Sequence, residues 1–187
     1  MQRPYSDTDL MAYSAEHVAY EVRMLFEIVV VMTRQMAASP VATSTSTTTL
    51  TSLGAAFSVP NSITPPLATG PSLPIVTNNA YIESFMVHLR NLIDFLFDLN
   101  PKPTDVAAVD FCGGSGWQPT LSQSLRDARR RVHKELAHLT TDRIPGSSPE
   151  KHWDFGGLAQ ELRSVLHDFA AKALASRLSP QVKMAIR

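Results

Sequence analysis

The chain has 187 residues, 44% of them hydrophobic, and its 17 lysines and arginines balance its 17 aspartates and glutamates. A chain of this length can bury a core, and its zero net charge excludes a uniformly basic surface, so any nucleic-acid site must be a local patch. The single cysteine, Cys112, excludes an internal disulfide and a thiolate zinc cage. The N-terminus has no signal-peptide pattern and the longest apolar run covers only residues 28–32, so we expect a cytoplasmic protein that does not enter a membrane.

A long uncharged segment interrupts the first half of the chain. No aspartate, glutamate, lysine or arginine occurs from Gln35 to Ile82, and Ser39 to Pro74 consists mainly of Ser, Thr, Pro, Ala and Gly. Such a composition buries too little apolar surface to offset its ordering entropy. We therefore expect one domain over residues 1–187 with a disordered insertion at 38–77. The insertion is either simply tolerated or a loop that binds a regulator or partner.

Four segments carry apolar residues at helical spacing. No segment shows sustained two-residue alternation, so no sheet is expected. The pattern predicts an all-α fold, an up-down bundle of four main helices with the long loop between the first and the second. The expected helices cover Asp7–Ala37, Asn78–Leu99, Thr120–Thr140 and Lys151–Arg177.

Neither a metal nor another cofactor is predicted. His17 and Glu21 lie one helical turn apart, but the sequence places no third ligand beside them. The glycines between Asp110 and Trp117 could cradle a phosphate, yet no strand precedes them and no Walker lysine follows. We interpret that segment as a connector.

The end of the third predicted helix carries the densest group of ionisable residues. Arg131 and His138 lie seven positions apart, on one flank of the helix, where Asp127 and Lys134 accompany them. His133 lies on the opposite flank. Arginine and histidine together can bind a phosphate and move a proton near neutral pH. A solvated helix end would have the same composition, so both interpretations stay open here.

The second predicted helix has a comparable pattern. Arg90 and Asp94 are four positions apart on a flank that also carries Glu83, whereas His88 and Asn91 share the other flank. The first group is either a local set of ion pairs or a phosphate clamp in which the acids hold Arg90 in place.

These residues resemble the HEPN superfamily (higher eukaryotes and prokaryotes nucleotide-binding). The likeness rests on the helical layout, on the segments His88–Phe95 and Lys134–Thr140, and on an arginine followed by a histidine late in the third helix. The family motif has four to six residues between its arginine and its histidine. In this chain six residues separate Arg131 from His138. Val132 stands where the family usually has a polar residue.

The resemblance implies a metal-independent endoribonuclease that cleaves single-stranded RNA through its 2′-hydroxyl, as in toxin or defence systems. It also implies a homodimer and an antitoxin or other protein partner, since active members typically dimerise. His138 would be the general base and Arg131 would hold the phosphate. The residues expected to assist in substrate binding are Arg90, Arg143, His88 and Lys134.

Inactive members of the superfamily lead to the alternative. In that case the chain is a non-catalytic helical bundle that binds a protein, nucleotide or RNA partner. His138 and Arg143 then only close the helix C-terminus, where cations interact favourably with the helix dipole.

Overall fold

The computed structural model describes residues 5–38, 73–113, 116–135 and 153–187. Within these ranges the chain is helical and contains no strand, so the all-α prediction is confirmed. The elements are α1 (Asp7–Tyr13), the π-helical turn η1 (Ser14–Val18), α2 (Ala19–Ala38), α3 (Leu73–Phe97), α4 (Ala108–Phe111), α5 (Gln123–Glu135), α6 (Phe155–Lys172) and α7 (Pro180–Ile186). Residues 39–72 of the insertion expected at 38–77 lie outside the described residues, whereas Ala38 still belongs to α2 and α3 already begins at Leu73.

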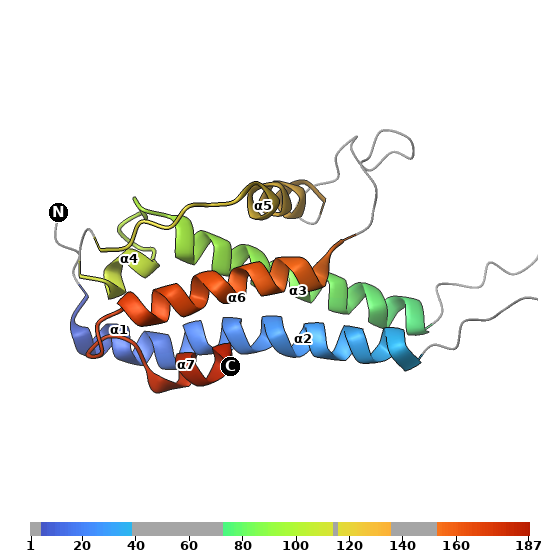
Figure 1. Cartoon of the computed structure of the whole chain (residues 1–187), viewed down its shortest axis with the longest axis horizontal. Coiled ribbons are helices and arrows are strands. Elements are labelled where there is room, and N and C mark those ends of the chain that lie inside the picture. Colours follow the sequence, from blue (N-terminus) through green and yellow to red (C-terminus); the bar gives the residue numbers. More distant parts are fainter. Residues whose placement is uncertain (1–4, 39–72, 114–115, 136–152) are drawn as a thin grey trace, which may run out of the picture.

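Two long helical rods form the base of the molecule (Figure 1). The first consists of α1, η1 and α2 in succession, and α3 packs beside it in the opposite direction. Helix α6 lies over both and runs in the same direction as α3 (Figure 1). Helix α5 crosses this layer at its outer edge instead of running antiparallel to α3, so the strict up-down order that we expected does not hold at α5.

The start of the first rod follows from its sequence. The Ser6 hydroxyl accepts a hydrogen bond from the backbone N–H of Asp9 at 3.1 Å, and the Asp9 carboxylate accepts one from the backbone N–H of Ser6 at 3.0 Å. This reciprocal capping box makes Ser6 the N-cap, and α1 begins at Asp7 as expected.

The core lies where α2, α3 and α6 meet. Apolar side chains recur there at helical spacing and are removed from water, which supplies the main driving force for folding. Phe169 of α6 packs edge-to-face against Phe95, Phe111 and Trp117, with centroid separations of 5.4–5.8 Å. The core side chains with no exposed surface include Val22, Leu25, Phe85, Leu89, Ile93, Leu96, Phe111, Leu162, Leu166, Phe169 and Val182.

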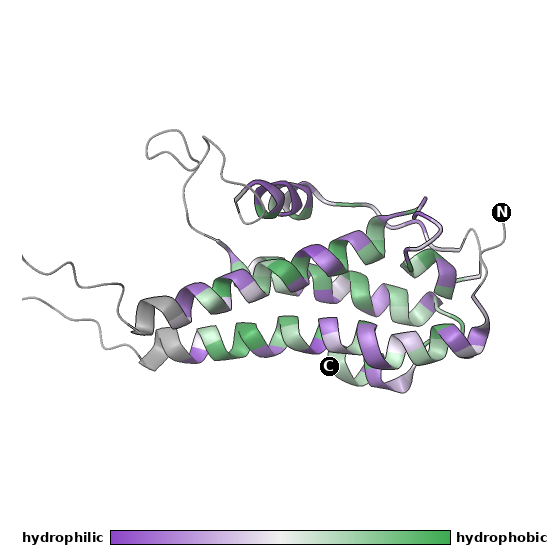
Figure 2. Cartoon of the chain, turned by 180° about the vertical axis from the view of Figure 1, so that it is seen from behind, coloured by the Kyte–Doolittle hydropathy of each residue, from purple (hydrophilic) through white to green (hydrophobic). Residues whose placement is uncertain are grey.

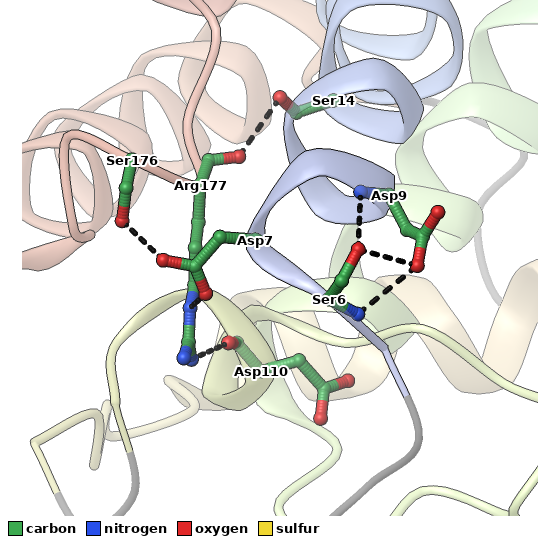
Figure 3. A network of polar contacts seen from close by, with 7 residues as sticks. All are labelled: Ser6, Asp7, Asp9, Ser14, Asp110, Ser176 and Arg177. Carbon is green, nitrogen blue, oxygen red and sulfur yellow. Dashed lines mark hydrogen bonds and ion pairs between the residues drawn. The ribbon is translucent and has the colours of Figure 1, made fainter.

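A polar network ties the chain's two ends together (Figure 3). Nε of Arg177 donates to Asp7 at 2.6 Å, and Nη1 of Arg177 donates to the carbonyl of Asp110 at 2.7 Å. The Ser176 hydroxyl also donates to Asp7, at 2.6 Å. Because Asp7 belongs to α1 and Asp110 to α4, one arginine from the α6–α7 connection fixes three parts of the fold.

The expected helix ends differ from the observed ones in a few places. The last predicted helix ends at Lys172, not at Arg177, because Ala173 adopts an extended conformation and the chain turns into α7. Periodicity predicts neither α4 nor α7, since helices of only four and seven residues carry little periodic signal. Residues 136–140 of the third predicted helix lie outside the described residues.

Candidate functional site

Helix α5 separates its side chains sharply by polarity. Leu125, Ala128 and Val132 recur on one stripe and are buried against the bundle. The opposite face carries charge, and Figure 2 shows α5 as a mainly hydrophilic helix at the edge of the molecule. Over Gln123–Glu135 the helix has four arginines and one lysine against two acids. A chain with no net charge thus concentrates positive charge on a single helix.

The centre of this outer face is a row of cations. Arg126, Arg130 and Lys134 repeat at four-residue spacing, so they lie one above another on the helix, about 6 Å apart along its axis. All three are exposed, and His133 is exposed beside them. We call Arg126, Arg130, His133 and Lys134 the basic ridge. Arg130 is paired with Asp127 at 3.1 Å, an exposed contact that stabilises the protein little and can be exchanged for another anion.

One flank of α5 is joined to α3 through a shared carboxylate. Asp94 pairs with Arg129 of α5 at 2.6 Å and with Arg90 of its own helix at 3.6 Å. The expected local ion pair of Arg90 and Asp94 is therefore present, and Asp94 also links α3 to α5 through Arg129. Arg90 stands on this flank of α5.

The other flank of α5 faces α6 and carries Arg131. The guanidinium carbon of Arg131 lies 3.8 Å from the centroid of the Trp153 ring, in a cation–π stack. Both side chains line a surface cavity of about 490 Å³ between α5 and α6. Asp127 and Glu161 also line it, and the Ser124 hydroxyl donates a short hydrogen bond to Glu161. We call this cavity the Trp153 pocket.

A second cavity, of about 400 Å³, lies between the first rod, α3 and the connection after α3. We call it the acidic pocket, because four carboxylates line it and would repel a phosphate. Burial, and then the nearby carboxylate of Glu21, raise the pKa of Tyr13 in its wall above the usual 10.0. The lining residues that set its character are Tyr13, His17, Glu21, Asp94, Asp98 and Asp105.

His88 is buried at the contact of α3 with α2. It is 7% exposed, and its Nδ1 lies 2.7 Å from a carboxylate oxygen of Glu21. Asn91 donates to the same carboxylate at 3.3 Å, which agrees with the flank that His88 and Asn91 were expected to share. The Tyr20 ring of α2 packs edge-on against the imidazole. His88 therefore joins α3 to α2 through its contacts with Glu21 and Tyr20.

Among the described residues, the four members of the predicted site do not gather in one place. Arg129 and Arg131 lie two positions apart and point about 200° apart around α5, so Arg90, on the Arg129 flank, is not brought to Arg131. His88 faces α2. Lys134 is exposed at the end of the basic ridge. His138 and Arg143 lie outside the described residues.

Two cations of the basic ridge, Arg126 and Arg130, are absent from the predicted site. Their four-residue spacing with Lys134 is visible in the sequence. The predicted site was centred on residues 131–143 instead, because it followed the family motif. The contact between Arg131 and Trp153 had no comparable signal, because a gap of 22 positions, part of it outside the described residues, separates the two in sequence.

Comparison with known proteins gave no match to a family model, to a curated protein or to a solved structure. In the described ranges, no helix is both long and apolar enough to cross a membrane. Nor does any group of three or more His, Cys, Asp or Glu side chains in those ranges have the arrangement of a metal site.

Proposed function

We propose that this protein is a HEPN-like helical bundle that binds single-stranded RNA along α5. The observation that carries the proposal is the basic ridge, an exposed row of cations on a chain whose net charge is zero. Phosphate contacts by Lys and Arg supply most non-specific nucleic-acid affinity. They serve RNA and DNA alike, and the choice of RNA follows from the resemblance to HEPN proteins.

The rest of the surface supports this placement. Asp98 and Asp105 of the acidic pocket disfavour a phosphate there, and the described candidates away from α5, Arg90 and His88, contact Asp94 and Glu21. Buried apolar side chains and the Arg129–Asp94 ion pair hold α5 to the bundle. The ridge is thus a firmly positioned charged surface, as a binding role without catalysis requires.

Fluorescence anisotropy with a labelled single-stranded RNA tests the proposal. The charge reversal Arg126→Glu, Arg130→Glu and Lys134→Glu should greatly weaken binding. A matched control reverses three exposed cations elsewhere, Arg23→Glu, Arg34→Glu and Lys183→Glu, and changes the net charge equally. Binding that is lost equally in both variants, or in neither, would contradict a site on α5.

The endoribonuclease remains a second candidate because of one observation. Arg131 is half-buried beside the Trp153 pocket, near the end of the helix that leads toward His138. In this case His138 takes the proton of the 2′-hydroxyl and Arg131, helped by Arg143, stabilises the phosphorane charge. As the 2′-oxygen bonds to phosphorus, the P–O5′ bond breaks and the 5′-oxygen takes up a proton, so one fragment ends in a 2′,3′-cyclic phosphate and the other begins with a 5′-hydroxyl.

Cleavage of labelled RNA in EDTA, beside the variant His138→Ala, distinguishes this candidate from the bundle that only binds. Cyclic-phosphate products that disappear in the variant support the nuclease. Efficient cleavage of DNA, which lacks the 2′-hydroxyl, or a strict need for metal contradicts it. The homodimer and the antitoxin partner that the resemblance implies are compatible with either function.

A further inference from the structure

The Trp153 pocket lies on the α6 flank of α5, around the helix from the centre of the basic ridge. Asp127 borders both, because it pairs with Arg130 of the ridge and also lines the pocket. A strand whose phosphates follow the ridge therefore passes the mouth of a cavity of about 490 Å³. Sites for single strands combine these two features, a cationic track for the backbone and an aromatic platform for the bases.

We propose that the Trp153 pocket receives one base of the bound strand, and that it prefers a base with an exocyclic amino group. This inference rests on the proposed RNA binding and adds the base-recognising part of the same site. The Arg131 guanidinium stacks directly on the Trp153 ring at 3.8 Å, so the base would stack on an outer face of this pair and not between its two members. Unpaired bases stack on aromatic rings and on guanidinium planes.

The polar side chains of the pocket determine which base fits. Glu161 is half-buried, and the Ser124 hydroxyl holds one of its carboxylate oxygens, Oε2. The other oxygen can accept a hydrogen bond from an amino group. Asp127 and Asp154 add further acceptors, although Asp154 already caps α6 through the N–H of Gly157 at 2.8 Å. Carboxylates accept from the N4 amino group of cytosine, whereas the O4 atom of uracil offers no donor.

For a protein that only binds RNA, the carboxylates in the pocket favour a base there over a phosphate. Asp127, Asp154 and Glu161 give the pocket a negative lining around one arginine. Because Asp127 is paired with Arg130, Asp154 and Glu161 set the charge of the pocket, and they disfavour a phosphate beside the single arginine. The phosphates therefore stay on the basic ridge, and only an uncharged, amino-bearing group enters the cavity.

Binding of three matched oligomers tests the proposal: oligo(C), oligo(U) and an abasic oligomer of the same length, each about ten nucleotides. Wild-type protein should bind oligo(C) roughly 5–150-fold more tightly than the abasic oligomer, the range expected for one stacked base. It should prefer oligo(C) to oligo(U) by at least about 5-fold. Free cytidine monophosphate should bind far more weakly than oligo(C), because it makes no contact along the ridge.

Three variants separate the contribution of the Trp153 ring from that of the Glu161 carboxylate. Trp153→Ala should bind oligo(C) no better than the abasic oligomer, while abasic binding stays at the wild-type level. Trp153→Phe keeps a smaller ring, so it should keep part of the base-dependent gain even if the alanine variant folds poorly. Glu161→Gln should reduce the preference for oligo(C) over oligo(U).

The outcomes distinguish the pocket from the ridge. Equal binding of oligo(C) and the abasic oligomer by the wild type, or a base-dependent gain that survives Trp153→Ala, overturns the pocket and leaves the ridge intact. Tight binding of free cytidine monophosphate overturns it as well, since the pocket would then serve a mononucleotide. Failure of every oligomer to bind the wild-type protein overturns the proposed function itself, and the inference with it.

Discussion

Nε of Arg177 donates a hydrogen bond to Oδ1 of Asp7 over 2.6 Å, although the two residues lie 170 positions apart. The same guanidinium donates to the carbonyl of Asp110, so α1, α4 and the connection before α7 depend on one side chain (Figure 3). None of these three parts belongs to α5, which carries the basic ridge. The contact allows the stability of the fold to be altered without a change in the surface that we propose binds RNA.

Replacement of Arg177 by alanine should destabilise the fold and leave RNA binding intact. The hydrogen bond from the guanidinium to the Asp110 carbonyl alone is worth about 1.5–3 kcal/mol. Urea unfolding measures the loss, and Arg177→Lys should recover part of it because it keeps the charge but not the forked geometry. An unchanged free energy of unfolding in Arg177→Ala would show that the network is not needed.

Stability should also decrease in acid through Asp7. Hydrogen bonds from Ser176 and then Arg177 lower the pKa of Asp7 below its usual 3.8. A lowered folded-state pKa gives stability that is present above pH 3.8 and is lost as the pH falls through the lower folded value. Unfolding curves of wild type and Asp7→Asn across this range should converge as the pH falls. Parallel curves would rule out a contribution from Asp7.

Cys112 should be unreactive in the folded protein. The thiol is 8% exposed, and burial raises its pKa to about 11, so little thiolate exists near neutral pH. A thiol reagent should react slowly at about pH 8 and rapidly once urea unfolds the chain. The chain has no other cysteine, so the signal belongs to Cys112. Rapid labelling of the native protein would contradict the burial.

Trp117 should matter for stability far more than Trp153. Its Nε1 donates to the carbonyl of Leu96 at 2.7 Å, within the last turn of α3, where carbonyls lack helical partners. Trp117→Phe should lower the free energy of unfolding by about 1–3 kcal/mol, because the buried Leu96 carbonyl loses its hydrogen-bond donor. The matched variant Trp153→Phe changes a half-buried ring and should unfold close to wild type. Similar losses in both would contradict this difference in role.

His88 gives a direct test of a role in substrate binding. Its contact with Glu21 joins α2 and α3, so His88→Ala should destabilise the protein by about 1–3 kcal/mol. The exposed His17, nearby on the first rod, serves as control, and His17→Ala should change stability by no more than about 0.5 kcal/mol. The folded His88→Ala protein should bind RNA normally. A selective loss of RNA binding without a loss of stability would restore the substrate-binding role.

The sequence predicted features that depend on local spacing. The helical stripes correctly indicated an all-α chain, and the four-residue spacing of Arg90 and Asp94 predicted their ion pair. His88 and Asn91 share a flank as the spacing indicated, whereas their common partner Glu21 was not predicted. Each of these depends on helical periodicity, which a single sequence displays.

The remaining features depend on tertiary contacts that periodicity does not encode. The Arg129–Asp94 pair places Arg90 on one flank of α5, and the Trp153 ring places Arg131 on the other. The predicted grouping of Arg90 with Arg131 failed to appear because a helix separates them. The crossing direction of α5 was equally invisible, since amphipathic spacing fixes the buried face of a helix and not its angle to its neighbours.

The salt dependence of RNA binding tests the central claim most directly. Counterion release from a single strand lowers log K by about 0.7 per log unit of salt for each phosphate contacted, so the ridge's Arg126, Arg130 and Lys134 should give a slope near −2. The charge reversal of these three residues should bring the slope close to zero at whatever weak affinity remains. The control reversal of Arg23, Arg34 and Lys183 should retain the wild-type slope. An unchanged slope in the ridge variant would contradict the assignment of RNA binding to α5.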